Sequence, residues 1–317
     1  MVMAPPSPLL VIVGPTGVGK TAVAVRLGQR LPTEIVSADS RQVYQGMDVG
    51  TGKPTPPERA AVRHHLLDLI HPDERYHAAR FRLQALEAIG GIRAREKLPA
   101  VVGGTGLYVR ALLKGLEAAP PADPALRSSL EALAGQEGSL ALHGRLAAAD
   151  PSAAARLHPN DRIRIIRALE KHAARGPAGA QDGGSWGRSR PPWRVLAIGL
   201  SRERHILNQS LKDRVEGMVA RGMMGEVRRL LAAGYDDGSP GMNGIGYRQF
   251  VAVAEGRLDE AEATRLMVRD TQRYAKRQMT WFQRDAEIHW LDVDRAGGVE
   301  ATAEAIGKLI TREGWIE

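Results

Sequence analysis

Cysteine is absent from the 317 residues of this sequence. Disulfide bonds, thiolate zinc sites and cysteine nucleophiles are therefore excluded. No apolar run is long enough to cross a membrane, and the first residues lack the basic and apolar regions of a signal peptide. We therefore expect a soluble, cytoplasmic protein with no membrane partner. No heptad pattern or apolar stripe calls for association, so we expect a monomer.

Acidic residues are in the minority, with 36 Asp and Glu against 44 Lys and Arg, a net charge of +8. This balance favours a polyanionic partner. Within residues 265–284, Asp270 is the only acid. The basic side chains of this stretch recur every four residues along one helix face, with an aromatic residue next in the series: Arg265, Arg269, Arg273, Arg277 with Lys276 beside them, and Trp281. A solvated face usually mixes both signs of charge, so the pattern favours contact with nucleic acid or phosphate.

A phosphate-binding loop follows the apolar run Leu9–Val13. Glycines let the backbone bend so that successive N–H groups and the N-terminus of the next helix point at an oxyanion. Lys20 adds a point charge for the terminal phosphate, and the hydroxyl of Thr21 can bind Mg²⁺. The loop consists of Gly14, Pro15, Thr16, Gly17, Val18, Gly19, Lys20 and Thr21.

The order of apolar runs predicts an α/β fold with a parallel sheet. Strands are expected at Leu9–Val13, Ile35–Val36 and Ala100–Val102, with helices over Thr21–Leu31 and about His77–Glu96. Ligands bind beyond the carboxyl ends of such strands. We therefore expect the phosphate loop and the segments after the second and third strands to converge on one cleft.

Two segments expected near this cleft contain polar residues for which the sequence allows more than one role. Asp39, just after a strand, could bind Mg²⁺, accept a proton or cap the next helix. The turn Asp48–Pro54 could bring N–H groups and a cation to an anion, although a surface turn would look similar. His64 and His65 are adjacent rather than spaced along a helix, which argues against zinc.

The strand at Ala100–Val102 ends in Gly103-Gly104-Thr105 and has no acid at its end. ATP-hydrolysing proteins and kinases with this loop normally carry a Walker-B aspartate there. Its absence weakens the hydrolase and motor readings.

The sequence pattern predicts two domains. Residues 121–191 are helical and bear arginines, and end in a Gly- and Pro-rich stretch, 176–192, typical of a linker. A strand at Val195–Leu200 then resumes the core, and the final third is mostly helix. We expect an α/β core of residues 1–120 and 192–317 with a helical insertion at 121–191.

The sequence resembles tRNA dimethylallyltransferases over nearly its whole length. The motifs that carry the resemblance are, in order, Gly14–Thr21, Ser37-Ala38-Asp39-Ser40, Asp48–Pro54, Gly103–Tyr108, His158–Asp161, Gly246–Gln249 and Lys276–Gln278. The resemblance implies a P-loop NTPase-like core. It also implies transfer of a dimethylallyl group from dimethylallyl diphosphate to the exocyclic N6 amine of the adenosine 3′-adjacent to the anticodon, in tRNAs reading codons that begin with U, with release of diphosphate.

The same resemblance assigns roles to residues. Lys20, Thr21 with Mg²⁺, and Arg214 would stabilise the diphosphate, and Asp39 would be the general base. The insertion would grip the anticodon arm. The residues matching positions that contact tRNA are Asp39, Ser40, Arg41, Gln42, Thr105, Arg127, Ile163, Arg164, Ile165, Ile166, Arg167, Asn243, Gly244, Ile245, Gly246, Tyr247, Arg248, Lys276, Arg277, Gln278 and Trp281.

One turn departs from the family pattern: Arg175-Gly176-Pro177 replaces a small-residue turn, so the contacts of that turn are in doubt. Three other functions stay open on the residues. An adenylate isopentenyltransferase would share the loop and Asp39 but act on a free nucleotide. A small-molecule kinase needs only the loop, and a nucleotide-gated RNA-binding protein would bind RNA without changing it.

Overall fold

The computed structural model describes residues 6–116, 123–175 and 193–315. The chain divides into two compact units, unit 1 of residues 1–114 and 190–317 and unit 2 of residues 115–189. The expected domain boundaries at 121 and 191 and the linker expected at 176–192 lie outside the described residues.

Unit 1 is built on a parallel sheet with the strand order β3-β2-β4-β1-β5-β6. Its central strand is buried on both faces, which explains the continuous apolar run at Leu9–Val13. The predicted α/β class is confirmed. The strands of the described chain are β1 (Ser7–Val13), β2 (Thr33–Ser37), β3 (His64–His65), β4 (Leu98–Gly103), β5 (Trp193–Ser201) and β6 (His289–Asp292).

The strands at both edges of the sheet were not predicted. β3 has two residues and β6 has four, and neither contains a long apolar run. The predicted helices are confirmed with small shifts at their ends. The long helix starts at Ala78 because the side chain of His77 accepts a hydrogen bond from the backbone of Arg80 and caps it.

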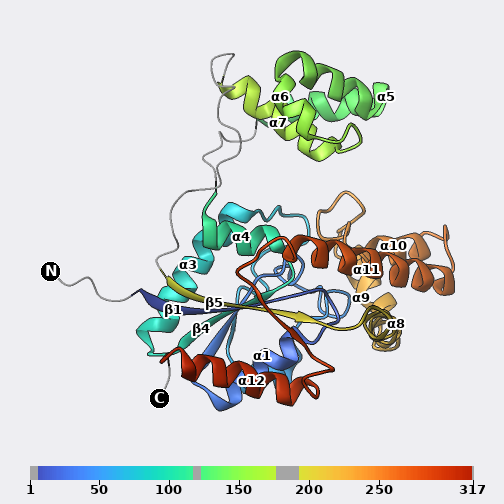
Figure 1. Cartoon of the computed structure of the whole chain (residues 1–317). Helices are drawn as coiled ribbons and strands as arrows, with labels where there is room; N and C mark the ends of the chain where they lie inside the picture. Colours follow the sequence, from blue (N-terminus) through green and yellow to red (C-terminus); the bar gives the residue numbers. More distant parts are fainter. Residues whose placement is uncertain (1–5, 117–122, 176–192, 316–317) are drawn as a thin grey trace. The chain divides into compact units, whose positions relative to one another are not determined.

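Helices cover both faces of the sheet (Figure 1). One face carries α1 and α12, which contact each other, and the opposite face carries α3 and α4. The bounds are α1 (Lys20–Arg30), α3 (Ala78–Ala94), α4 (Gly106–Lys114) and α12 (Val299–Arg312), with the short α2 (Pro56–Ala61) between β2 and β3.

Four helices lie beyond the carboxyl ends of the strands, at the right of Figure 1. They share a second apolar core that includes Tyr247, Phe250 and Met223, each at most 1% exposed. This core supports the edge of the sheet at which the site forms. The helices are α8 (Arg204–Ala220), α9 (Met223–Ala232), α10 (Tyr247–Ala254) and α11 (Glu260–Phe282).

The described part of unit 2 is helical, as predicted. Its core contains Leu142, Leu146, Ile165 and Ile166. The first helix breaks at Gly138, where φ is 81°. The helices are α5 (Pro124–Ala149), α6 (Pro151–Arg156) and α7 (Arg162–Arg175). Across both units, none of the described helices has the length and apolar character that crossing a membrane requires.

A buried carboxylate links β2 to its surroundings. Glu34 is 1% exposed and pairs with Arg95 (2.6 Å), His65 (2.7 Å) and Lys97 (3.2 Å). Hydrogen bonding by Arg95 is the largest cause that lowers the pKa of Glu34, to about 2. The ionised form of Glu34 therefore stabilises the fold.

We expect Glu34→Gln to lower the free energy of unfolding by about 1–3 kcal/mol at neutral pH, because the cations Arg95 and Lys97 lose their charged partner. The contribution of Glu34 is complete above its ordinary pKa and is lost as the pH falls toward 2, so wild type and variant should converge in acid. Urea denaturation at several pH values measures this. Glu304→Gln, on the exposed face of α12, is the control and should change stability by less than about 0.5 kcal/mol.

Candidate functional site

The phosphate-binding loop connects β1 to α1, as the sequence predicts. It packs against α8. Gly17 has a φ of 78°, and a Cβ there would lie 2.5 Å from Cδ2 of Leu211, so a glycine is required by both backbone and space. Lys20 opens α1, and its Nζ donates a hydrogen bond to the carbonyl of Pro15 at 2.8 Å. The side chain of Lys20 is therefore held by the backbone of the same loop.

Two cations and one carboxylate meet beside this loop. Burial is the main cause that lowers the pKa of Lys20, to about 8, while Asp39 raises it and Arg214 lowers it further. Burial likewise lowers the pKa of Arg214, and the charge of Asp39 opposes that shift. The guanidinium of Arg214 donates to the carbonyl of Gly52 at 3.5 Å. This arrangement concentrates positive charge where an anion would enter.

Asp39 divides its two oxygens between structure and cavity. Oδ1 accepts hydrogen bonds from the backbone N–H of Arg41 at 2.8 Å and of Gln42 at 3.4 Å, which is the capping role considered from the sequence. Among the described residues, Oδ2 has no hydrogen-bond partner. The Asp39 side chain also lines the cavity, so the carboxylate is held by one oxygen and open through the other.

One cavity of about 580 Å³ contains most of the predicted site of unit 1. The residues come from the phosphate loop, the segment after β2, and helices α8, α10 and α11, and the cleft expected at the carboxyl ends of the strands is therefore present. The predicted residues that line it are Thr16, Gly17, Gly19, Lys20, Thr21, Asp39, Ser40, Arg41, Gln42, Arg214, Asn243, Gly244, Ile245, Tyr247, Arg248, Arg277 and Gln278.

The turn at Asp48–Pro54 does not present its lysine to this cavity. Lys53 is buried, and its Nζ contacts Asp48 (2.7 Å), Asp68 (2.5 Å) and the carbonyl of Tyr44 (2.5 Å). The suggestion that this turn brings a cation to an anion is therefore wrong, because internal carboxylates neutralise Lys53. The backbone from Gly50 to Gly52 does line the cavity.

Glu226 holds that turn in place and was missed from the sequence. Its carboxylate, 1% exposed, accepts hydrogen bonds from the N–H groups of Asp48, Val49 and Gly50 and from the hydroxyl of Tyr247 at 2.6 Å. A carboxylate that accepts hydrogen bonds from several consecutive backbone N–H groups holds the turn in one conformation. The signal was present, because Glu226 lies at helical spacing on an apolar face with Met223, Val227 and Leu230.

Several residues predicted to contact tRNA have buried side chains. Tyr247 is 1% exposed and binds Glu226, and Gln278 is 6% exposed with both ends of its amide bound to backbone. In unit 2, Ile165 and Ile166 belong to the apolar core. These side chains support the fold, and their contact with tRNA stays a prediction.

The other residues of unit 2 that were predicted to contact tRNA differ in how exposed their side chains are. Arg127 and Arg167 both pair with the buried Glu170, at 2.6 and 2.9 Å. Arg164 has a side chain 65% exposed, and Ile163 is 82% exposed. These two lie at the start of α7 and face solvent.

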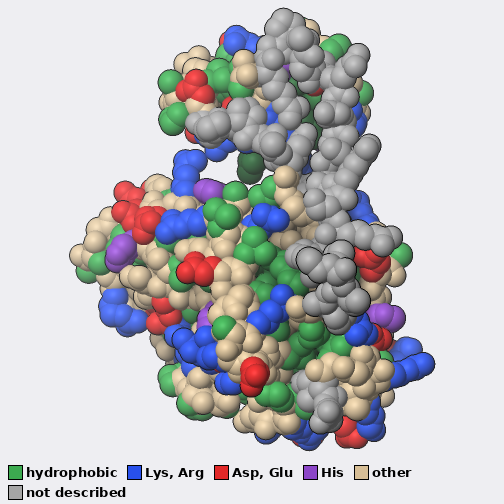
Figure 2. All heavy atoms as spheres, turned by 90° about the vertical axis from the view of Figure 1, so that its left-hand side faces the viewer, with side chains coloured by type: hydrophobic (Ala, Val, Ile, Leu, Met, Phe, Trp, Pro, Cys, Tyr) green, Lys and Arg blue, Asp and Glu red, His purple; other side chains and the backbone are tan. Residues whose placement is uncertain are grey.

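The basic stripe of α11 is partly neutralised. Asp270 accepts hydrogen bonds from Arg269 at 3.0 Å and from Arg248 at 2.6 Å, and Arg265 pairs with Glu262. Arg277 lies over the ring of Tyr274, 5.8 Å from its centroid. On the face of the molecule in Figure 2, basic and acidic side chains are interspersed, so the net positive charge does not gather there.

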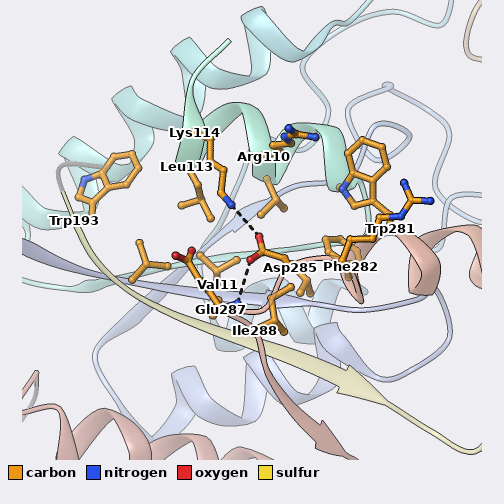
Figure 3. Close-up of a pocket in the computed structure, with 16 residues that line it drawn as sticks. Val11, Arg110, Leu113, Lys114, Trp193, Trp281, Phe282, Asp285, Glu287 and Ile288 are labelled. Atoms are coloured by element: carbon orange, nitrogen blue, oxygen red, sulfur yellow. Dashed lines mark hydrogen bonds and ion pairs between the residues drawn. The ribbon is translucent and has the colours of Figure 1, made fainter. Parts of the chain in front are cut away.

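Trp281 lines a second cavity, of about 660 Å³, instead of the first (Figure 3). Apolar side chains of β1 and β5 form one wall, and α4 and the end of α11 form others. An ion pair between Lys114 and Asp285, 3.4 Å apart, lies at this cavity. Of the other predicted residues, Thr105 supports the first cavity by accepting a hydrogen bond from the N–H of Ser40 at 3.1 Å.

Metal binding by protein side chains alone has little support. Within the described part of the chain, no group of three or more His, Asp or Glu residues is arranged to hold a metal ion. His65 binds Glu34, and a ring nitrogen of His64 binds the carbonyl of Val62. Thr21 lines the first cavity, and a single hydroxyl fits Mg²⁺ when phosphate oxygens and waters complete the coordination shell.

Comparisons with known proteins point one way. The family model described as IPP transferase matches residues 42–285, and that described as isopentenyl transferase matches residues 7–71. A tRNA dimethylallyltransferase of Geobacter metallireducens is 47% identical over 90% of this chain and 92% of its own. One of Thermomicrobium roseum is 45% identical over 96% and 92%. The crystal structure of a tRNA isopentenylpyrophosphate transferase of Bacillus halodurans, 37% identical, superposes with a TM-score of 0.70 and covers 97% of this chain and 98% of its own.

The lowered pKa of Lys20 makes anion binding sensitive to pH. Lys20 is charged below about pH 8 and loses its proton above, so the affinity of the free protein for pyrophosphate should fall about tenfold between pH 7 and pH 9. Isothermal titration calorimetry measures this. Lys20→Met should bind more weakly, with no loss of affinity over the same range; an identical pH response in the variant would assign the effect to another group.

Proposed function

This chain belongs to the tRNA dimethylallyltransferase family and transfers a dimethylallyl group to tRNA, and from this premise we propose how its residues perform the reaction. The observation that carries the proposal is the meeting of Lys20, Arg214 and Asp39 in one cavity. The acceptor is the N6 amine of the adenosine 3′-adjacent to the anticodon in tRNAs reading codons that begin with U. The C–N bond forms as the allylic C–O bond breaks, and diphosphate leaves.

The phosphate loop binds the diphosphate as it departs. Negative charge grows on the leaving oxygen, so the N–H groups from Gly17 to Thr21, the ammonium of Lys20 and the guanidinium of Arg214 stabilise the transition state more than the ground state. Partial burial strengthens these interactions because few water molecules compete. Thr21 and the diphosphate would hold Mg²⁺, which supplies a further positive charge there.

Asp39 binds the attacking amine and accepts its proton. Its Oδ2 can accept a hydrogen bond from the N6 amine, while Oδ1 keeps the carboxylate oriented through the N–H groups of Arg41 and Gln42. The amine becomes acidic as the C–N bond forms, and its proton then passes to the carboxylate. The negative charge of Asp39 also interacts with the charges of Lys20 and Arg214.

RNA contact combines both units. The adenine leaves its stack to enter the cavity, past residues Ser40–Gln42 and the exposed Arg248 and Arg277. Unit 2 grips the anticodon arm through its exposed groups, Ile163 and Arg164. The protein acts as a monomer in the cytoplasm. The free-nucleotide alternative is not favoured, since the similar proteins are named as enzymes acting on tRNA.

The function is tested by mass spectrometry of unmodified tRNA after incubation with protein, Mg²⁺ and dimethylallyl diphosphate. We expect a gain of one dimethylallyl group on the adenosine 3′ of an anticodon that ends in A. A parallel reaction offers AMP as the acceptor. Modification of AMP with unchanged tRNA would establish the free-nucleotide alternative, and tight RNA binding without any covalent change would favour a binding protein.

Asp39→Asn should lower kcat by about 10²–10⁴-fold, because the amide keeps the shape of the carboxylate but cannot take the proton. The tRNA dissociation constant should change by less than about twofold. Single-turnover kinetics and filter binding measure the two quantities.

The matched control is Asp259→Asn at the start of α11, where the carboxylate caps the helix through the N–H of Glu262. Asparagine caps equally well, so this variant should keep wild-type kinetics. Full activity of Asp39→Asn would remove Asp39 from the chemistry.

A further inference from the structure

The side chain of Gln278 ties the phosphate loop to helix α11. Its Oε1 accepts a hydrogen bond from the backbone N–H of Thr16 at 2.8 Å, and its Nε2 donates to the carbonyl of Gly104 at 2.8 Å. Gln278 is 6% exposed. One buried amide thus bridges the loop after β1 and the loop after β4, which are neighbouring strands of the sheet.

The fit around this amide is close. A Cβ added to Gly104 would lie 2.2 Å from Nε2 of Gln278, so the backbone and the amide touch without room for a methyl group. A buried amide with donor and acceptor both satisfied favours one arrangement of its partners, because any other leaves a polar group unpaired. Gln278 therefore sets the separation between the two loops.

Two neighbouring residues on α11 line the first cavity together with Gln278. Arg277 is exposed and also lines the cavity, and Tyr274, one turn earlier, hydrogen-bonds Thr105. The helix therefore brings both a cation, Arg277, and the anchor of the phosphate loop, Gln278, to this cavity. The N–H of Thr16 already donates to Gln278, so it is not available to an anion. The hydrogen bond instead contributes to anion binding by fixing the shape of the loop.

We propose that Gln278 is a positioning residue for the diphosphate and not a contact of tRNA. It holds the first half of the phosphate loop in the conformation that receives the diphosphate, with Gly104 as the fixed point on the sheet. This inference rests on the proposed function of the loop as a diphosphate site.

The first test replaces Gln278 by methionine, which keeps the length of the side chain and removes both hydrogen bonds. We expect pyrophosphate to bind about tenfold more weakly, because the loop loses its anchor, and the KM for dimethylallyl diphosphate to rise similarly. The dissociation constant for tRNA, measured without dimethylallyl diphosphate, should stay within about twofold of wild type. Gln272→Met is the matched control on the same helix, where the amide only donates to the carbonyl of Asn208, and should leave all three constants unchanged.

A second variant perturbs the same bridge from the other side. Gly104→Ala pushes a methyl group against Nε2 of Gln278 and should weaken pyrophosphate binding in the same way. In a Gln278→Ala background the space is free, so Gly104→Ala should add little. Such non-additivity ties the two residues to one interaction.

Weaker tRNA binding with unchanged pyrophosphate binding in folded Gln278→Met would overturn the inference and restore the tRNA contact. Unchanged binding of both would overturn it as well. If Gln278→Met fails to fold, Gly104→Ala decides: unchanged pyrophosphate binding in that variant, or full additivity with Gln278→Ala, contradicts the bridge. Pyrophosphate binding needs no turnover, so a wild-type protein that binds it without modifying tRNA would count against the proposed function alone.

Discussion

The site depends on keeping two cations charged while they are partly withdrawn from water. Lys20 and Arg214 both lose hydration at the phosphate loop, and burial lowers the pKa of each. Asp39 offsets that cost through its negative charge. The three groups come from the start of α1, the segment after β2 and α8, so the sheet and the helix packed beyond it must be in place before the charges can balance.

A layer of backbone interactions holds these groups in position. The carboxylate of Glu226 accepts hydrogen bonds from the N–H groups of Asp48 to Gly50. The carbonyl of Gly52, in the same turn, accepts a hydrogen bond from Arg214. The buried acid of α9 thus acts on the arginine of α8 through a turn that precedes both by more than 150 residues in the sequence. Such indirect support explains how a cavity lined by flexible side chains keeps a defined geometry.

The sequence predicted what local patterns encode. The phosphate loop, β1 and the cleft at the strand ends followed from glycine spacing and apolar runs, and all are present. β6 was missed because it is short and polar at both ends. Which charges neutralise each other was also beyond local patterns, since Lys53 meets Asp68 and Arg127 meets Glu170 only after folding. The resemblance named Tyr247 and Gln278 as part of the site, but only packing reveals that both face inward.

The register of the sheet constrains the order in which the protein is made. β1 pairs along its length with β5, from Ser7 opposite Trp193 to Val13 opposite Gly199, and the carbonyl of Leu200 lies against Gly14. On the ribosome, the chain emerges from its N-terminus, so β1 and the phosphate loop leave the exit tunnel long before β5 does. One side of β1 must therefore wait, unpaired, until all of unit 2 has been translated. A nascent chain that stops short of β5 would carry a complete phosphate-loop sequence but only one of the two strands that flank β1.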